Sequence, residues 1–157
     1  MKTPFNFIAL ATFLLVMGLS TDTFAQKYSE SDLQRTFQRF LTDEGIESTV
    51  DSDGDIQFEY EDRNYFIEVN ENDNEFFRLV LFNIWEIESR AEHEEVQDAC
   101  DAVNREAKVA KAYTTNENVW IATEMFIERP DHYEGVFYRC LQSIDNSVGI
   151  FVREMRE

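Results

Sequence analysis

Basic residues are scarce in this chain. Among 157 residues, 14 are Lys or Arg and 32 are Asp or Glu, so the formal net charge is −18. Proteins that bind nucleic acids or anionic membrane surfaces place cations against phosphates. The composition therefore argues against both kinds of binding. The same charge favours solubility and suits a basic partner.

Glycine and proline are also rare, with five and two residues, whereas the chain has 14 Phe, six Tyr and two Trp. Disordered chains contain few aromatic residues, and aromatic side chains are the largest contributors to a buried core. We find no linker, repeat or low-complexity tract. These features predict a folded domain.

A long apolar run occurs at the N-terminus, from Phe5 to Leu19, and nowhere else. One basic residue precedes it, and the small residues Thr23 and Ala25 follow, an order typical of a cleavable signal peptide. The run is shorter than the roughly 20 apolar residues of a membrane-spanning helix, and no basic cluster follows it. We therefore predict a signal peptide in residues 1–25, cut after Ala25, and one domain in residues 26–157. The mature protein is expected to be periplasmic or secreted, with no stable membrane insertion.

Two cysteines, Cys100 and Cys140, are present, and they are too far apart in sequence for a CxxC redox motif. Export would permit a disulfide between them. The alternative is that both are buried thiols in the core. Both lie on apolar faces of expected helices, so sequence leaves both interpretations open.

The apolar spacing predicts three helices and up to six strands. The helices are expected at 31–43, with Ser31 and Gln34 as a capping box, at 89–106, with Ser89 and Glu92 as a second box, and from Pro130 to Met155, with Asp131 as the cap. Strands are expected at 46–50, 56–60, 65–69, 76–85, 109–113 and 119–128, with turns at 51–55, 62–64 and 114–118. The order α-β-β-β-α-β-β-α with hairpin connections predicts an α+β fold with a largely antiparallel sheet of five or six strands.

Residues of the kinds that perform catalysis or bind metals show no characteristic spacing. His93 and His132 each lack a second His at the spacing of a zinc site, which indicates surface residues. The turn that contains Asp51, Asp53 and Asp55 is a weak candidate for a cation, because the calcium loop of an EF-hand needs further ligands and flanking helices. An acidic hairpin turn is the favoured interpretation. The sequence predicts no catalytic residue, no resident metal and no cofactor.

Both faces of the two longest strands are apolar. In the strand at 76–85, one face carries Phe77, Leu79, Leu81 and Trp85, and the other carries Arg78, Val80, Phe82 and Ile84. In the strand at 119–128, one face carries Val119, Ile121, Met125 and Ile127, and the other carries Trp120, Ala122 and Phe126. Either helices cover both faces, or one apolar stripe remains for a second copy or a client polypeptide. The candidates for partner contact are Phe77, Leu79, Leu81, Trp85, Trp120 and Phe126.

Several short segments extend together over most of residues 31–155: 40–46, 53–58, 77–81, 103–104 with 107–111, and 119–126 with the last helix. These segments resemble the YbjN-like family of bacterial sensory transduction regulators. The resemblance implies a fold similar to type III secretion chaperones, in which helices pack on a curved antiparallel sheet and homodimers are common. It brings no catalytic residues to this chain. The export signal departs from familiar cytoplasmic members and argues against an intracellular signalling role.

The leading hypothesis is therefore an exported, non-enzymatic module that binds another polypeptide, or a second copy of itself, through a sheet face or the second helix. A rival hypothesis is a small carboxylate-dependent hydrolase, which requires a deep pocket with two acidic side chains of altered pKa. A cation- or ligand-binding module is the third.

Overall fold

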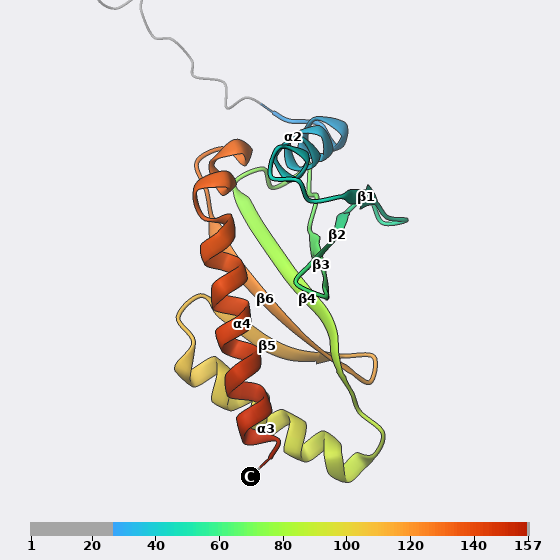
Figure 1. The fold of residues 1–157 in the computed structure, drawn as a ribbon, viewed down its shortest axis with the longest axis vertical. Helices are drawn as coiled ribbons and strands as arrows, with labels where there is room; N and C mark the ends of the chain where they lie inside the picture. Colours follow the sequence, from blue (N-terminus) through green and yellow to red (C-terminus); the bar gives the residue numbers. More distant parts are fainter. Residues whose placement is uncertain (1–26, 157) are drawn as a thin grey trace, which may run out of the picture.

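One antiparallel sheet of six strands, in the order β1-β2-β3-β4-β6-β5, forms the centre of the protein (Figure 1). The computed structural model describes residues 27–156, so the predicted signal peptide lies outside the described residues. The α+β fold and the order of its elements confirm the prediction. The elements are α2 (Glu30–Asp43), β1 (Ser48–Val50), β2 (Ile56–Tyr60), β3 (Arg63–Ile67), β4 (Phe76–Glu86), α3 (Arg90–Glu106), β5 (Ala110–Thr115), β6 (Asn118–Phe126), the 3-10 helix η1 (Pro130–Gly135) and α4 (Phe137–Glu154).

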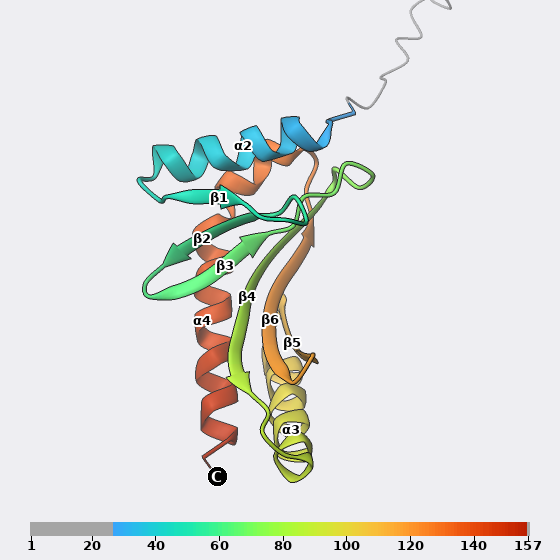
Figure 2. The same cartoon turned by 90° about the vertical axis from the view of Figure 1, so that its right-hand side faces the viewer.

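The helices lie on one face of the sheet. Figure 2 shows α4 along this face, with α2 and α3 at its two ends, and within residues 27–156 no helix lies on the opposite face. Each helix contributes its apolar stripe to the same core, which includes Phe37 of α2, Val96 of α3 and Ile144 of α4. The expectation that helices cover both sheet faces is therefore wrong. The alternative, in which one face keeps no helical cover, describes the arrangement.

Two tight turns lengthen the hairpins beyond their predicted ends. Glu61 and Asp62 have φ of 51° and 60°, and Asn116 and Glu117 have φ of 49° and 57°. Two consecutive residues of positive φ between antiparallel strands form the turn whose twist matches that of the strands. The predicted turns at 62–64 and 114–118 are thus shorter, and β3 begins at Arg63 rather than at residue 65.

Two helix starts differ from prediction. The cap of α2 is Ser29, whose side chain accepts from the Asp32 amide while Asp32 bonds back to the Ser29 amide, so the predicted box at Ser31 is wrong by two residues. Asp131 does not cap a helix, because its carboxylate binds Arg129 instead. Residues 130–135 form the 3-10 helix, and α4 begins only at Phe137.

A bulge near the end of β4 changes which side chains face the core. Asn83 has φ of 54°, and the pairing with β6 shifts between Leu81 and Trp85. An extra residue in one strand reverses the alternation beyond it. Ile84, expected on the helix-free face, therefore packs against the main core, as Trp85 also does.

The exposed edge of β5 is covered by a side chain of α3. The Asn104 amide nitrogen donates to the Ala112 carbonyl at 3.0 Å, and its oxygen accepts from the Ala112 amide at 2.9 Å. Unpaired strand edges invite association with other chains. Asn104 thus occupies backbone groups that an added strand would otherwise use. The other edge, β1, has three residues.

Candidate functional site

The helix-free face carries a second, smaller apolar cluster, which we call the open-face cluster. It consists of buried Phe66, Val80 and Ala122 and half-buried Phe82, Tyr113 and Trp120. The strand register produces it, because Phe66 pairs with Val80, Val80 with Ala122, and Tyr113 with Trp120. The cluster therefore extends across four neighbouring strands, β3, β4, β6 and β5.

Trp120 lies at the middle of this cluster. Its ring centroid is 5.6 Å from that of Phe66, 6.1 Å from Phe82 and 6.3 Å from Tyr113. The indole nitrogen donates to the Asn83 side chain at 3.0 Å, so the β4 bulge holds the ring in place. A half-buried indole with a fixed orientation is typical of the aromatic anchors found in binding interfaces.

A network of ion pairs borders the cluster. The Arg78 guanidinium lies 2.7 Å from Glu68 and 3.0 Å from Glu124, and Lys111 lies 2.7 Å from Glu124. Arg78 also donates to the Tyr113 hydroxyl and lies 5.8 Å from the centre of that ring. Burial raises the pKa of the Tyr113 phenol, which stays protonated near neutral pH. The network holds the Tyr113 ring in place, and its two cations are balanced by two carboxylates.

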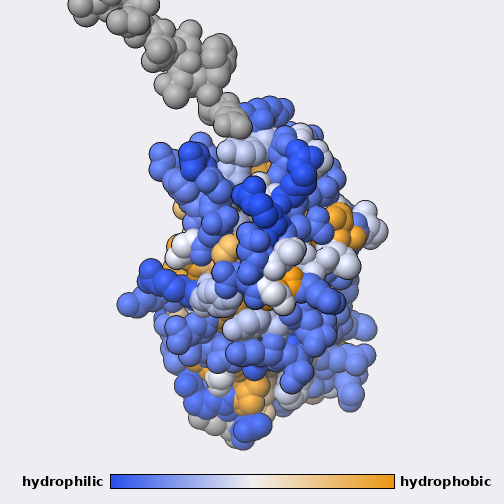
Figure 3. Space-filling view, turned by 45° about the horizontal axis from the view of Figure 1, so that its top comes forward, coloured by the Kyte–Doolittle hydropathy of each residue, from blue (hydrophilic) through white to orange (hydrophobic). Residues whose placement is uncertain are grey.

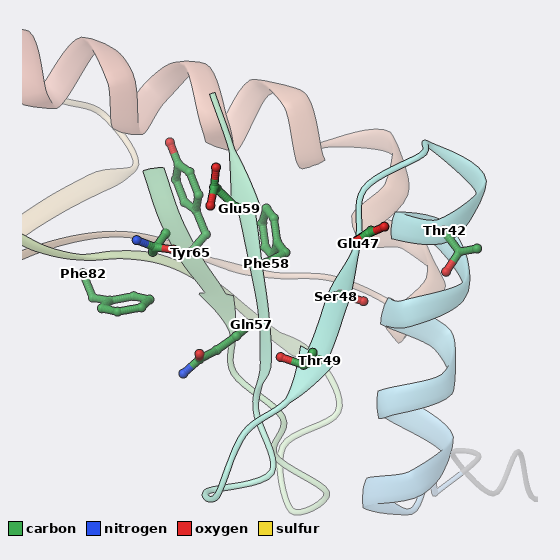
Figure 4. A pocket seen from close by; sticks show the side chains of 10 residues that line it. Thr42, Glu47, Ser48, Thr49, Gln57, Phe58, Glu59, Tyr65 and Phe82 are labelled. Atoms are coloured by element: carbon green, nitrogen blue, oxygen red, sulfur yellow. The ribbon is translucent and has the colours of Figure 1, made fainter. Parts of the chain in front are cut away.

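A depression of about 590 Å³ adjoins the cluster at Phe82. Its lining includes Thr49 and Gln57, which Figure 4 shows with Phe82 on the side of the strands away from α4. Glu47 and Glu59 also line it and add two carboxylates. The open face thus combines an aromatic surface with an acidic, hydrogen-bonding hollow.

The six residues predicted to contact a partner fall in three different places. Phe77, Leu79 and Leu81 are at most 2% exposed in the main core, so the prediction is wrong for them in this fold. Trp85 is half-buried on the core side, where it packs against Phe151 and donates to Glu92 at 2.8 Å.

Trp120 and Phe126 are the two candidates that lie on the helix-free face. Phe126 is 81% exposed, and its ring lies 5.8 Å from that of Phe76 at the end of the same face. Phe66 and Tyr113 were not among the candidates. Their alternation in β3 and β5 indicates the face on which they lie, but the absence of a covering helix is a property of the tertiary fold.

The acidic turn uses its carboxylates to stabilise the hairpin. Asp51 accepts from the amides of Asp53 and Asp55 at 2.9 and 3.0 Å, and from the Gln57 side chain at 3.0 Å. Asp55 accepts from the Val69 amide at 2.8 Å, while its burial raises its pKa. Within residues 27–156, no group of three or more side chains is arranged to hold a metal. The two histidines lie apart, His93 in α3 and His132 in η1.

The carboxyl groups of altered pKa do not share a pocket. Hydrogen bonds from Ser29 lower the pKa of Asp32, and hydrogen bonds from the Glu88 amide and the Trp85 indole lower that of Glu92. With Asp55, these residues lie in α2, α3 and the β1–β2 turn. The geometry therefore offers no support for a carboxylate pair that performs hydrolysis.

Cys100 and Cys140 are free, buried thiols, so of the two interpretations that the sequence left open, the buried thiols describe the structure and the disulfide does not. Burial raises the pKa of Cys100 to about 11 and also raises that of Cys140. Thiols of high pKa react slowly, because the thiolate is the nucleophile. Both cysteines act as small core residues. The described part of the chain also contains no helix with the length and hydropathy to cross a membrane.

The sequence profile of a known family, YbjN, described as "Putative bacterial sensory transduction regulator", matches residues 35–127. The chain belongs to the YbjN family. A search of curated proteins finds no match. Among solved structures, the fold is similar to that described as "Crystal structure of YbjN, a putative transcription regulator from E. coli", with 15% identity, a TM-score of 0.55, and coverage of 77% of this chain and 89% of that one. At this identity, the structural likeness supports the YbjN fold alone.

Proposed function

We propose that this YbjN-family protein is an exported, non-enzymatic regulatory module that binds a basic polypeptide segment on its open face. The observation that carries this proposal is the open-face cluster, an aromatic surface on the central strands that no helix of residues 27–156 covers. Membership of a family described as regulators supports the regulatory part. The predicted signal peptide supports the exported part.

The residue types of the open face are those that interfaces favour. Trp, Tyr, Phe and Arg are enriched at protein interfaces, and a few aromatic anchors supply most of the binding energy. Trp120, Phe82 and Tyr113 are half-buried and held by neighbours, so little side-chain freedom is lost when a partner covers them. The adjoining depression gives space for a side chain of the partner.

Charge favours a basic partner over a second copy of this chain. Each copy has a net charge of −18, and two copies would repel one another. Glu47 and Glu59 lie at the depression, whereas Arg78 and Lys111 are already paired with carboxylates. A basic segment would meet unpaired negative charge beside the aromatic rings. Such binding is expected to weaken as salt is added.

The proposal is tested by photo-crosslinking from the two sides of the sheet. A photoreactive phenylalanine analogue replaces Phe82 on the open face, and a matched variant carries it at Tyr138, an exposed aromatic residue of α4. We expect capture of a basic polypeptide from position 82 and none from position 138. That polypeptide, once purified, should bind Trp120→Ala about 30-fold more weakly than the parent protein.

Three results would overturn the proposal. One is equal capture from both positions, and another is capture of an acidic polypeptide. The third is a Trp120→Ala protein that remains folded and binds as tightly as the parent. Light scattering over a concentration series separately tests self-association, which we expect to be absent at low salt.

A further inference from the structure

A groove of about 570 Å³ lies on the helical side of the protein, between α4, the end of α3 and the segment that follows it. We call it the α4 groove. Its volume is in the range of small-molecule sites, roughly 300–1,000 Å³. The apolar part of its lining comes from Ala107, Val109, Met125, Val136, Cys140 and Ile150. Hydrophobic residues form small separate patches on the mainly hydrophilic face that Figure 3 shows.

Val109 makes the apolar character of the groove accessible to solvent. It is 47% exposed, one of a few large apolar residues with that much exposure in the described chain. Met125, Val136 and Ile150 behind it are half-buried rather than buried. Covering these side chains would remove apolar surface from water, which is favourable for any ligand with a hydrocarbon portion.

The charge at the groove is opposite in sign to that of the whole protein. Lys108 and Arg139 line it, both are exposed, and neither forms an ion pair among residues 27–156. Glu106 also lines it, but its carboxylate is bound by Arg153 at 2.8 Å. Two free cations therefore border a groove whose lining combines apolar residues with uncharged polar ones, in a chain of net charge −18.

The cation of Arg139 acts on the interior of the groove. Burial raises the pKa of the Cys140 thiol, and the Thr123 side chain and then the positive charge of Arg139 partly oppose that rise. Cys140 itself is 1% exposed, so the groove ends on a closed core rather than on a channel. Met125 and Ile150 line the same groove as Arg139 and supply apolar surface beside it.

We propose that the α4 groove binds a single-chain anionic amphiphile, such as a fatty carboxylate, with its chain on the apolar lining and its head group between Lys108 and Arg139. The two cations select an anion, and the apolar lining selects a hydrocarbon chain. A free phosphate has the negative charge but lacks the hydrocarbon chain, and a cation lacks the negative charge. This site is on the opposite side of the sheet from the open face, so it does not depend on polypeptide binding there.

Titration calorimetry of the full mature protein with octanoate, decanoate and dodecanoate below their micellar concentrations tests the chain requirement. Affinity should rise about two- to fourfold with each added methylene, the upper value corresponding to full burial at roughly 0.8 kcal/mol. Decanol at the same concentration should bind at least about tenfold more weakly than decanoate, because it lacks the charge that the two cations attract.

Two charge-reversal variants test the head-group position. Lys108→Glu with Arg139→Glu should reduce decanoate affinity at least about tenfold. The matched control is Arg39→Glu, an exposed cation on α2 that forms no ion pair within residues 27–156, which should leave decanoate affinity unchanged. Circular dichroism and the melting temperature show that each variant is folded.

The proposal is overturned if decanol and decanoate bind equally, or if chain length has no effect. It is also overturned if the double variant binds as the parent does, or if Arg39→Glu weakens binding as much. Binding to vesicles of phosphatidylglycerol without binding to decanoate would instead indicate a membrane surface, and would also overturn it.

Discussion

Asn104 provides the sharpest test of how the β5 edge of the sheet is protected. Its side chain bonds both the amide and the carbonyl of Ala112 at the outer edge of β5. Asn104→Ala would remove both bonds and leave the two backbone groups without this partner. Asn104→Asp would keep the acceptor for the Ala112 amide but would place a carboxylate against the Ala112 carbonyl.

The magnitude follows from two neutral hydrogen bonds and one correction for helix propensity. Each bond contributes about 0.5–1.5 kcal/mol, so Asn104→Ala should lose about 1–3 kcal/mol. Alanine favours the helix over asparagine by up to ~0.7 kcal/mol, which offsets part of the loss. The free energy of unfolding should fall by about 1–2 kcal/mol, and the melting temperature by roughly 3–8 °C for a domain of this size.

Urea unfolding of the mature protein measures the free energy, and hydrogen exchange at the Ala112 amide measures the local effect. Asn146→Ala on α4 is the matched control, because Asn146 is an exposed helical residue that lines the α4 groove without a hydrogen bond among the described side chains. That control should be as stable as the parent or slightly more stable. Asn104→Asp should keep more protection at Ala112 than Asn104→Ala does.

The reasoning is refuted if Asn104→Ala and Asn146→Ala change stability by the same amount while the Ala112 amide stays protected. Such a result would mean that water replaces the Asn104 side chain at no cost. The edge of β5 would then be closed by packing against α3 rather than by hydrogen bonding.

Buried polar groups give the remaining predictions. Thr123→Val should raise the free energy of unfolding in urea by about 1 kcal/mol, and a loss of stability would contradict this prediction. The reason is that the Thr123 hydroxyl is buried without a well-formed hydrogen bond, and its neighbour Cys140 is a weak partner. Tyr133→Phe should cost about 1–2 kcal/mol, since the Tyr133 hydroxyl donates to the buried Phe37 carbonyl at 3.1 Å; an unchanged midpoint would show that this bond is dispensable. Alkylation of Cys100 at pH 8 should be slow until denaturant is added, and rapid alkylation of the native protein would show that Cys100 is not buried. The contribution of the buried Cys100 thiol to stability should be full below pH 9, the pKa of the unfolded thiol, and should fall as pH rises toward about 11.

The sequence was sufficient for the elements and their order, because the three helices and the longer strands each have a clear apolar period. Prediction from the sequence failed where the choice of a helix cap depended on neighbouring side chains. Ser29 and Ser31 are both good caps, and the selection of Ser29 depends on Asp32 returning a hydrogen bond to it. Asp131 is a good cap by type, but Arg129 beside it binds the carboxylate.

The candidate site was predicted in part. Alternation indicated that Trp120 and Phe126 share a face, and the structure places both on the helix-free side. The same pattern could not distinguish that face from the one with Phe77 and Leu79, since both read as apolar. The distinction requires knowledge of where three amphipathic helices pack, which is set by loop lengths and by Tyr133 between α2 and the sheet.

The position of α4 after all six strands of the sheet has a consequence for biosynthesis. A ribosome releases β1 to β6 before it releases Phe137, yet Phe137, Ile144 and Phe151 of α4 are core residues that cover the sheet. Until α4 emerges, the inner face of the sheet is open to water and to other nascent chains. A premature stop after β6 would therefore yield an aggregation-prone chain rather than a slightly shorter protein. The emergence of α4 sets the time at which this domain can complete its core.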